Sequence, residues 1–388
     1  MEDSVPIGSM LDGRYRIEAV LGSGGMGKVY KGQHTGIGRT VAIKVLHNDL
    51  SKNPEAAQRF QREAIASGRL DHPNIVTVSD SGVLPDGSCY LVMEALEGES
   101  LGERLDREHR IAWPDAIEII RGVLRGLGHA HERGVVHRDI KPDNIFLARK
   151  DGSITVKILD FGIAKLYAGN ANDPASTRAG LTVGTPAYLS PEQAVGGEIT
   201  PAADLYSTTI MLFEMLAGRT PFIDSDPLSM LGMHVGKDPP RVAEIAPDIV
   251  LPAGLEEVIA HGLGKLASER IASAPDYLAR LDAIVPSGSG QLAIAEHAQA
   301  ATWVQPAPQA HPPAPLHMPV HTPVHTPVPV HTPAPAHPPA PLGMSIPPVW
   351  IKIGWIAFAA IMVIGIIAAI ANHTSKPAKP APAVHTGP

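Results

Sequence analysis

Apolar and polar positions follow a strand-like pattern between about residues 15 and 96. Side chains alternate from Tyr15 to Leu21, and Lys28 to His34 is predicted to be the hairpin partner of that strand. A β-branched run follows from Thr40 to Leu46. Leu91 to Leu96 is a further apolar strand, which an Asp86-Gly87 turn would connect to a preceding strand. The pattern therefore predicts a small β-rich region built from hairpins.

One helix is predicted within this β-rich region. Asn53-Pro54 has the form of a helix start, with Asn as the N-cap and Pro in the first turn. The helix would run through Phe60 and Ile65, and it would carry Glu63.

The predicted turn between the first two strands is rich in glycine. Leu21-Gly22-Ser23-Gly24-Gly25-Met26-Gly27-Lys28-Val29 contains Gly-x-Gly-x-x-Gly-x-Val, and glycine lets backbone N–H groups approach phosphate oxygens. Dinucleotide-binding folds place a similar pattern between a strand and a helix. Here the glycines connect two strands, which favours a lid over phosphate groups.

The most informative motif is His137-Arg138-Asp139-Ile140-Lys141-Pro142-Asp143-Asn144, followed by Asp160-Phe161-Gly162. Asp139 can accept the proton of an attacking hydroxyl, and Lys141 can neutralise a phosphoryl group in transfer. Asn144 and Asp160 can hold magnesium ions between phosphates. These residue types in this order indicate phosphoryl transfer from ATP.

The order of the motifs resembles that of protein kinases, and in particular of bacterial eukaryotic-like Ser/Thr kinases of the single-pass membrane type. The segment from Asp139 to Asn144 follows Asp-x-Lys-x-x-Asn, the form typical of Ser/Thr rather than tyrosine kinases. The resemblance covers about residues 15–283 and implies an α+β, bilobal protein kinase fold, with a β-rich N-lobe and a helical C-lobe. It also implies an enzyme of bacterial signal transduction that transfers the γ-phosphoryl group of ATP to Ser or Thr of protein substrates, with Mg²⁺ or Mn²⁺.

The resemblance assigns roles to individual residues. The implied catalytic residues are Asp139, Lys141, Lys44 and Glu63, of which Glu63 would orient Lys44; an ordinary surface charge is the alternative for Glu63. The implied metal ligands are Asn144 and Asp160. The implied nucleotide contacts are Leu21, Gly22, Gly24, Gly27, Val29, Ala42, Lys44, Glu94, Leu96 and Phe146. For residues 91–96, a plain buried strand would give the same composition.

Residues 163–190 resemble an activation loop. We expect autophosphorylation at Thr177 and Thr182, with Ser176 as a further hydroxyl in the same stretch, and Arg138 is expected to bind the phosphate through paired hydrogen bonds. Hydroxyls that only solvate the loop are the alternative. Thr185 matches a position that bonds the catalytic Asp and Lys. A homodimer would allow one copy to phosphorylate another.

The C-terminal part of the resemblance concerns scaffold residues. Glu192 is expected to pair with Arg270, and Asp204 to anchor the backbone of the catalytic loop. Two positions depart from the family pattern: Thr209 replaces a glycine, and Ile271 stands where proline is common. Thr209 adds a β-branched side chain where helix packing usually has none.

The remaining chain is predicted to be linker, membrane span and tail. Residues 284–349 form a Pro/Ala/His-rich juxtamembrane linker, which holds no Asp, Glu, Lys or Arg between 305 and 348 and is expected to be disordered. Six of its histidines could bind a metal, although a plain spacer is the favoured interpretation: His311, His317, His321, His325, His331 and His337. From Ile353 to Ala371 every residue is apolar or Gly, which predicts a transmembrane helix over 350–371.

These predictions also concern location. Residues 1–14 form an N-terminal segment without an apolar signal region, and ATP chemistry requires the kinase domain to be cytoplasmic. The chain would then be a single-pass protein of the cell (inner) membrane, in contact with the lipid bilayer, and residues 372–388 would form a short extracytoplasmic tail. Cys89 is the single cysteine, which excludes an intramolecular disulfide, and the net charge of −7 argues against nucleic-acid binding.

Two other functions have to be weighed. The first is a catalytically silent pseudokinase scaffold anchored at the membrane. Pseudokinases usually lack at least one of the strand lysine, the catalytic aspartate and the metal-binding aspartate, but this chain has Lys44, Asp139 and Asp160. The second is a small-molecule phosphotransferase of related fold. The segment from Gly184 to Glu192 disfavours it, because in protein kinases this segment shapes a groove for a protein substrate.

Overall fold

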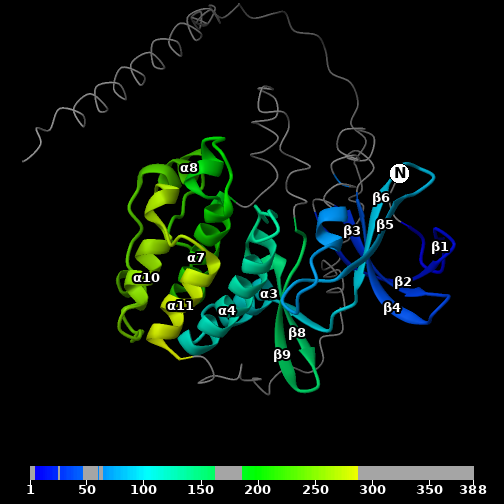
Figure 1. The fold of residues 1–388 in the computed structure, drawn as a ribbon, viewed down its shortest axis with the longest axis horizontal. Helices are drawn as coiled ribbons and strands as arrows, with labels where there is room; N and C mark the ends of the chain where they lie inside the picture. The colour runs from blue at the N-terminus through cyan, green and yellow to red at the C-terminus, as the bar shows by residue number, and fades with distance from the viewer. Residues whose placement is uncertain (1–4, 25–26, 47–59, 61–63, 162–185, 287–388) are drawn as a thin grey trace, which may run out of the picture. The chain divides into compact units, whose positions relative to one another are not determined.

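The structure is a computed structural model, and it describes residues 5–24, 27–46, 60, 64–161 and 186–286 (Figure 1). The predicted membrane span and tail, and the predicted linker after residue 286, lie outside these ranges. Among the residues that the structure describes, no helix is long and apolar enough to cross a membrane.

The N-terminal part is a six-stranded antiparallel sheet, with its strands in the order β1-β2-β3-β4-β6-β5 (Figure 1). The strands are β1 (Met10–Leu11), β2 (Tyr15–Gly24), β3 (Gly27–His34), β4 (Arg39–Leu46), β5 (Val78–Val83) and β6 (Cys89–Glu94). The predicted hairpins are confirmed: Gly24 pairs with Gly27, and Val83 pairs with Cys89 around the predicted turn. The N-terminal segment also adds β1 to the edge of the sheet.

Both faces of this sheet are buried, and the strand period of two decides which residues share a face. Val41, Ile43 and Val45 of β4 pack into one apolar cluster, with Tyr30 and Tyr90. Ala42 and Leu46 pack into a second cluster on the opposite face. Lys44 has the same parity as Ala42 and Leu46, so its ammonium lies on their side of the sheet.

The C-terminal part is mostly helical. Its α-helices are α3 (Leu101–Glu108), α4 (Trp113–His131), α6 (Pro191–Ala194), α7 (Pro201–Ala217), α8 (Pro227–Gly236), α9 (Val242–Ile245), α10 (Leu255–Gly262) and α11 (Ala274–Ile284). The short 3₁₀ helices are η1 (Pro142–Asn144), η3 (Pro186–Tyr188) and η4 (Ala267–Glu269). A small antiparallel sheet of β7 (Gly98–Ser100), β8 (Ile145–Lys150) and β9 (Ser153–Ile158) accompanies them.

Helix α7 is the centre of this helical part. Pro201 begins it, Gly218 ends it in the left-handed conformation, and almost every residue between them is buried. A helix that is buried on all sides belongs to a core, and α7 packs against α4 and α10. This β-rich and helical architecture agrees with the predicted kinase fold.

Candidate active site

The β2–β3 hairpin carries the glycine motif, as the sequence predicts. A Cβ built on Gly27 would lie 2.1 Å from the Val45 carbonyl oxygen, so this position requires glycine for the close approach of β3 to β4. A Cβ built on Gly24 would meet no atom within 4 Å. The two glycines therefore serve different purposes: Gly27 permits strand packing, and Gly24 leaves space beside the tip of the hairpin.

Lys44 and Asp160 form an ion pair that joins β4 to the segment after β9. The Lys44 Nζ lies 2.6 Å from Asp160 Oδ2, and the side chains are 8% and 23% exposed. Asp160 has a φ of 55°, a left-handed conformation that non-glycine residues rarely adopt. Strained backbone of this kind is concentrated at functional sites, where the surrounding structure holds it in place.

The second group of site residues lies on the loop that ends in η1. Lys141 Nζ is 2.9 Å from Asp139 Oδ2, and Asn144 Nδ2 donates to the Asp139 backbone oxygen at 2.7 Å and to its Oδ2 at 3.0 Å. Since both bonds use the nitrogen of the Asn144 amide, its oxygen is left to accept or to coordinate. The predicted base, phosphate-binding lysine and metal-binding amide are thus in direct contact.

These side chains suit a magnesium site that is completed by phosphate. Mg²⁺ prefers oxygen ligands and is usually bound through one or two protein groups together with substrate phosphates and water. Asn144 and the partly exposed carboxylate of Asp160 supply such oxygens. In the described part of the chain, no group of three or more His, Cys, Asp or Glu is arranged so that it could hold a metal ion by itself.

Asp204 of α7 holds the backbone of the catalytic loop. It is 1% exposed, and its two oxygens accept the N–H of His137 at 2.8 Å and the N–H of Arg138 at 2.7 Å. His131 Nε2 lies 2.8 Å from the same carboxylate. Arg138 has a φ of 74°, so Asp204 stabilises a loop with strained backbone, and the predicted anchoring role is confirmed.

His137 connects the two groups of site residues, a role that the motif alone does not show. The Asp139 N–H donates to His137 Nδ1 at 3.2 Å, so Nε2 carries the proton and donates to the Leu159 oxygen at 2.7 Å. The ring also packs edge-on against Phe161, with centroids 4.7 Å apart. The base-bearing loop and the strand that leads to Asp160 are therefore fixed to one imidazole.

Four apolar residues among the predicted nucleotide contacts lie together and form an apolar wall: Leu21, Val29, Ala42 and Leu96. Ala42 and Met93 are buried in one cluster, with Leu21, Val29 and Leu96 packed against it. Phe146 is buried on β8, in the smaller sheet. The Glu94 N–H donates to the Thr77 oxygen at 3.0 Å. It is therefore not available to bind the nucleobase of ATP.

The Glu94 side chain is engaged as well. It lies 2.7 Å from Lys157 Nζ and accepts the Thr77 N–H at 2.8 Å. Burial raises the pKa of this carboxyl, but the bonds from Lys157 and Thr77 outweigh burial and leave the pKa below its usual value. Glu94 thus fixes the end of β6 beside the apolar wall.

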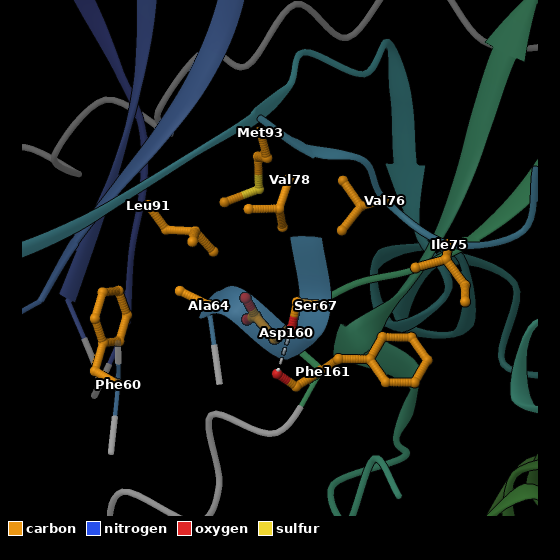
Figure 2. Close-up of a pocket in the computed structure, with 10 residues that line it drawn as sticks. All are labelled: Phe60, Ala64, Ser67, Ile75, Val76, Val78, Leu91, Met93, Asp160 and Phe161. Atoms are coloured by element: carbon orange, nitrogen blue, oxygen red, sulfur yellow. Dashed lines mark hydrogen bonds between the residues drawn. The ribbon is translucent and has the colours of Figure 1, made fainter. Parts of the chain in front are cut away.

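Asp160, the partner of Lys44 in the ion pair, also lines a small apolar cavity (Figure 2). Its volume of about 10 Å³ is close to what one water molecule needs, so it is not the nucleotide site. The Ser67 hydroxyl donates to the Phe161 oxygen across one side at 3.2 Å. The lining residues are Phe60, Ala64, Ser67, Ile75, Val76, Val78, Leu91, Met93, Asp160 and Phe161.

The predicted pair between Glu192 and Arg270 is confirmed. Arg270 Nη1 and Nη2 donate to the two Glu192 oxygens at 2.8 and 2.6 Å, a bidentate geometry. The same guanidinium donates to three backbone oxygens, on Ala202, Gly264 and Lys265. Burial raises the pKa of Glu192, and Arg270 outweighs this effect, so the pKa is lowered.

The packing around Thr209 explains how its departure from the family pattern is tolerated. Its Oγ1 donates to the Leu205 oxygen at 2.7 Å and lies 3.1 Å from the Tyr277 hydroxyl. Opposite it stands Gly262 of α10, where an added Cβ would lie 2.2 Å from Thr209 Oγ1. The absence of a side chain at Gly262 thus leaves room for the Thr209 side chain. Ile271, the second departure, is 2% exposed and joins the helical core.

Several predicted residues lie outside the described part of the chain: Glu63, Thr177, Thr182 and Thr185. Their predicted roles stay predictions. Arg138, the expected phosphate ligand, is described, and its Nε is buried without a hydrogen-bond partner among the described residues.

Comparisons with known proteins agree with this geometry. The family described as "Protein kinase domain" matches residues 15–247. Serine/threonine-protein kinase pkn3 of Myxococcus xanthus is 38% identical over 279 residues, which cover 72% of this chain and 51% of that protein. Pkn1 of the same organism is 40% identical over 298 residues, or 76% of this chain and 40% of the relative. The chain thus spans about half or less of these curated relatives.

A solved structure gives the same result for the fold. The kinase domain of Mycobacterium tuberculosis PknI aligns with a TM-score of 0.58 at 27% identity, and the alignment covers 72% of this chain and 99% of that domain. The family match at residues 15–247 covers more than half of the 388 residues. The chain therefore belongs to the protein kinase family.

Proposed function

We propose that this protein is a serine/threonine protein kinase that transfers the γ-phosphoryl group of ATP to Ser or Thr of proteins. The observation that carries the proposal is the set of contacts among the predicted catalytic side chains. Lys44 lies against Asp160, and Lys141 and Asn144 both lie against Asp139. Five charged or coordinating groups of the kinds needed for phosphoryl transfer are thus held on one anchored loop and its neighbouring strands.

Each residue has a chemical task in this reaction. Asp139 orients the acceptor hydroxyl and takes its proton, and Lys141 stabilises negative charge on the phosphoryl group beside it. Lys44 binds phosphate oxygens from β4. Asn144 and Asp160 would hold Mg²⁺, which when bound supplies positive charge between the phosphates. Catalysis then consists mainly of positioning and charge neutralisation.

The finer features of the proposal follow from the sequence. The enzyme phosphorylates its own loop at Thr177 and Thr182, and Arg138 receives the phosphate. A transmembrane helix over 350–371 anchors it in the cell membrane, with the kinase domain cytoplasmic. A homodimer permits autophosphorylation between copies.

Two alternatives are less consistent with the observed contacts. A pseudokinase scaffold has no need for a strained Asp160 in contact with Lys44, or for a base bonded to a lysine and an amide. A small-molecule phosphotransferase has no need for residues 186–194 to be fixed to the helical core through Glu192 and Arg270.

The test is transfer from γ-labelled ATP by the full-length chain with Mg²⁺. Three samples are compared: the chain alone, the chain with a generic protein substrate, and the chain with small alcohols and aminoglycosides as acceptors. We expect label on Ser or Thr of protein only. Binding of ATP without transfer to any acceptor would support the scaffold, and label only on the small acceptors would support the third function.

A further inference from the structure

Helices α3 and α6 both begin with a capping box, and the two boxes end in different residues. At α3 the Ser100 hydroxyl accepts the Glu103 N–H at 3.1 Å, and the Glu103 carboxylate accepts the Ser100 N–H at 2.7 Å. At α6 Ser190 and Gln193 make the same pair of bonds, at 3.4 and 3.0 Å. Glutamate would serve this purpose too, and its negative charge is favourable at a helix N-terminus. The amide of Gln193 thus has one group that the capping box does not use, its NH₂.

This NH₂ group donates to the catalytic loop. Gln193 Nε2 lies 2.7 Å from the Arg138 backbone oxygen. The orientation of the amide is fixed, because its oxygen accepts the Ser190 N–H and only its nitrogen can donate to a carbonyl. An ionised glutamate would instead place an oxygen against the Arg138 oxygen. The start of the helix can be capped by either residue, whereas the contact with the loop requires the amide.

The contact completes the bonding of the backbone around Arg138. This residue has a φ of 74°, and its N–H donates to Asp204 Oδ1 at 2.7 Å. The Asp139 N–H donates to His137 Nδ1 at 3.2 Å, and the Asp139 oxygen accepts from Asn144 Nδ2 at 2.7 Å. With the amide on α6, every backbone N–H and C=O of Arg138 and Asp139 has a partner. Loss of that amide would leave a strained φ held from one side only, directly before Asp139.

The amide is carried by a segment that is itself fixed to the helical core. Glu192, the neighbour of Gln193, accepts both terminal nitrogens of Arg270. In η3, which precedes α6, the Tyr188 oxygen accepts the Ser207 hydroxyl of α7 at 2.7 Å. The segment formed by η3 and α6 is therefore a firm support from which Gln193 reaches the catalytic loop.

We infer that Gln193 is a positioning residue for Asp139: its amide holds the Arg138 oxygen, and so the segment formed by η3 and α6 sets the orientation of the base. The inference rests on the proposed kinase function. It gives this segment an effect on the transfer step that it does not have on ATP binding, because none of these contacts involves Lys44, Asp160 or the glycine hairpin.

The test uses the full-length chain and two substitutions at one position. Gln193→Glu keeps an acceptor for the Ser190 N–H but has no donor for the Arg138 oxygen, and Gln193→Met removes both groups at similar size. We expect the rate constant for phosphate transfer to a protein in a single turnover to fall about tenfold in both variants, the usual effect of losing one hydrogen bond. The KM for ATP should stay unchanged. A role in capping alone predicts the full rate in Gln193→Glu and a loss only in Gln193→Met.

Glu103→Met is the control for the loss of a cap. Glu103 is exposed and makes the corresponding bond at α3, without a contact to the catalytic loop. Its replacement should lower the melting temperature and leave the transfer rate unchanged. Melting temperatures also show which variants are folded, and if one Gln193 variant does not fold, the other decides.

Several results would overturn the inference. It is wrong if Gln193→Glu transfers phosphate at the wild-type rate, if both Gln193 variants raise the KM for ATP, or if Glu103→Met slows transfer equally. Failure of both Gln193 variants to fold would show that the residue serves stability instead. A wild type that phosphorylates no protein would remove the proposed function as well, so the two failures are distinguishable.

Discussion

The catalytic site and the helical part of the molecule that supports it are built by opposite rules. In the catalytic site, Asp139 and Asp160 keep part of their carboxylates accessible, and Asp160 has strained backbone. In the scaffold, Asp204 and Arg270 are almost wholly buried, and each makes several hydrogen bonds. In the catalytic site, the backbone is strained and oxygen atoms remain free to bind a ligand. In the helical part, the buried polar groups have their hydrogen bonds satisfied and hold the backbone in place.

The comparison predicts that substitutions in the catalytic site reduce activity and that scaffold substitutions reduce stability. Asp160→Asn should show the largest effect. It removes the charge that would hold Mg²⁺ and that now pairs with Lys44, so we expect phosphate transfer to fall about 10³-fold, with little change in unfolding free energy.

Asp151→Asn is the matched control for Asp160→Asn. Asp151 has a φ of 50°, close to that of Asp160, but it lies in the exposed turn between β8 and β9. Kinetic assays and urea unfolding of both variants give the answer. Equal loss of activity in the two would contradict a specific role for Asp160.

Lys44→Arg should have the next largest effect. The guanidinium keeps the positive charge but not the size or point-like geometry of the ammonium that now lies 2.6 Å from Asp160 Oδ2, so transfer should fall about 10²-fold. The same change at Lys31 of β3, whose side chain is 48% exposed, should leave the rate unchanged. A full rate in Lys44→Arg would show that charge alone, without position, suffices.

Gly262→Ala tests the scaffold side of the comparison. The added methyl would meet Thr209 Oγ1 at 2.2 Å, and overpacking of this kind should lower the unfolding free energy by about 2 kcal/mol. The double variant with Thr209→Ala should recover part of this loss. In Gly128→Ala the methyl would lie 3.7 Å from Ala274, an ordinary contact, and stability should be kept. Additive effects of Gly262→Ala and Thr209→Ala would contradict the compensation.

The smallest expected effect concerns pH. Burial lowers the pKa of His234 to about 4, so between pH 6.5 and 4 the unfolded chain binds more protons than the folded one. The stability from a neutral His234 is present above the unfolded pKa and declines as pH falls. Between pH 6.5 and 5 it should decline by about 1.5 kcal/mol more in the wild type than in His234→Asn. Urea unfolding at both pH values measures the difference, and parallel losses would show that His234 does not titrate between them.

Much of the catalytic site could be predicted from the sequence, because its signals are local. The β-branched run from Thr40 to Leu46 predicts the strand that carries Lys44, and the run from His137 to Asn144 fixes the spacing of Asp139, Lys141 and Asn144. The order of the motifs resembles that of protein kinases, and this resemblance predicts the fold.

The scaffold was harder to predict, because its partners are far apart in sequence. Nothing near Thr209 indicates that Gly262 makes room for it, and nothing near His234 indicates its contact with Tyr206. Helix α8 reads as an ordinary apolar helix, and only tertiary packing shows that its polar residue is the buried one. The resemblance to the family predicts the pair between Glu192 and Arg270, because both residues match family positions. It does not predict the packing of Thr209 against Gly262, because Thr209 departs from the family pattern.

The most direct test of the central claim compares the wild type with Asp139→Asn, full length, in phosphate incorporation from labelled ATP with Mg²⁺, followed by mapping of the labelled residues. Asp139 accepts bonds from Lys141 and Asn144, and the amide would keep the shape of the carboxylate but lose its basicity. The account predicts label on Ser or Thr in the wild type only, with equal melting temperatures. Equal label in both proteins, or ATP binding without label in either, would contradict it.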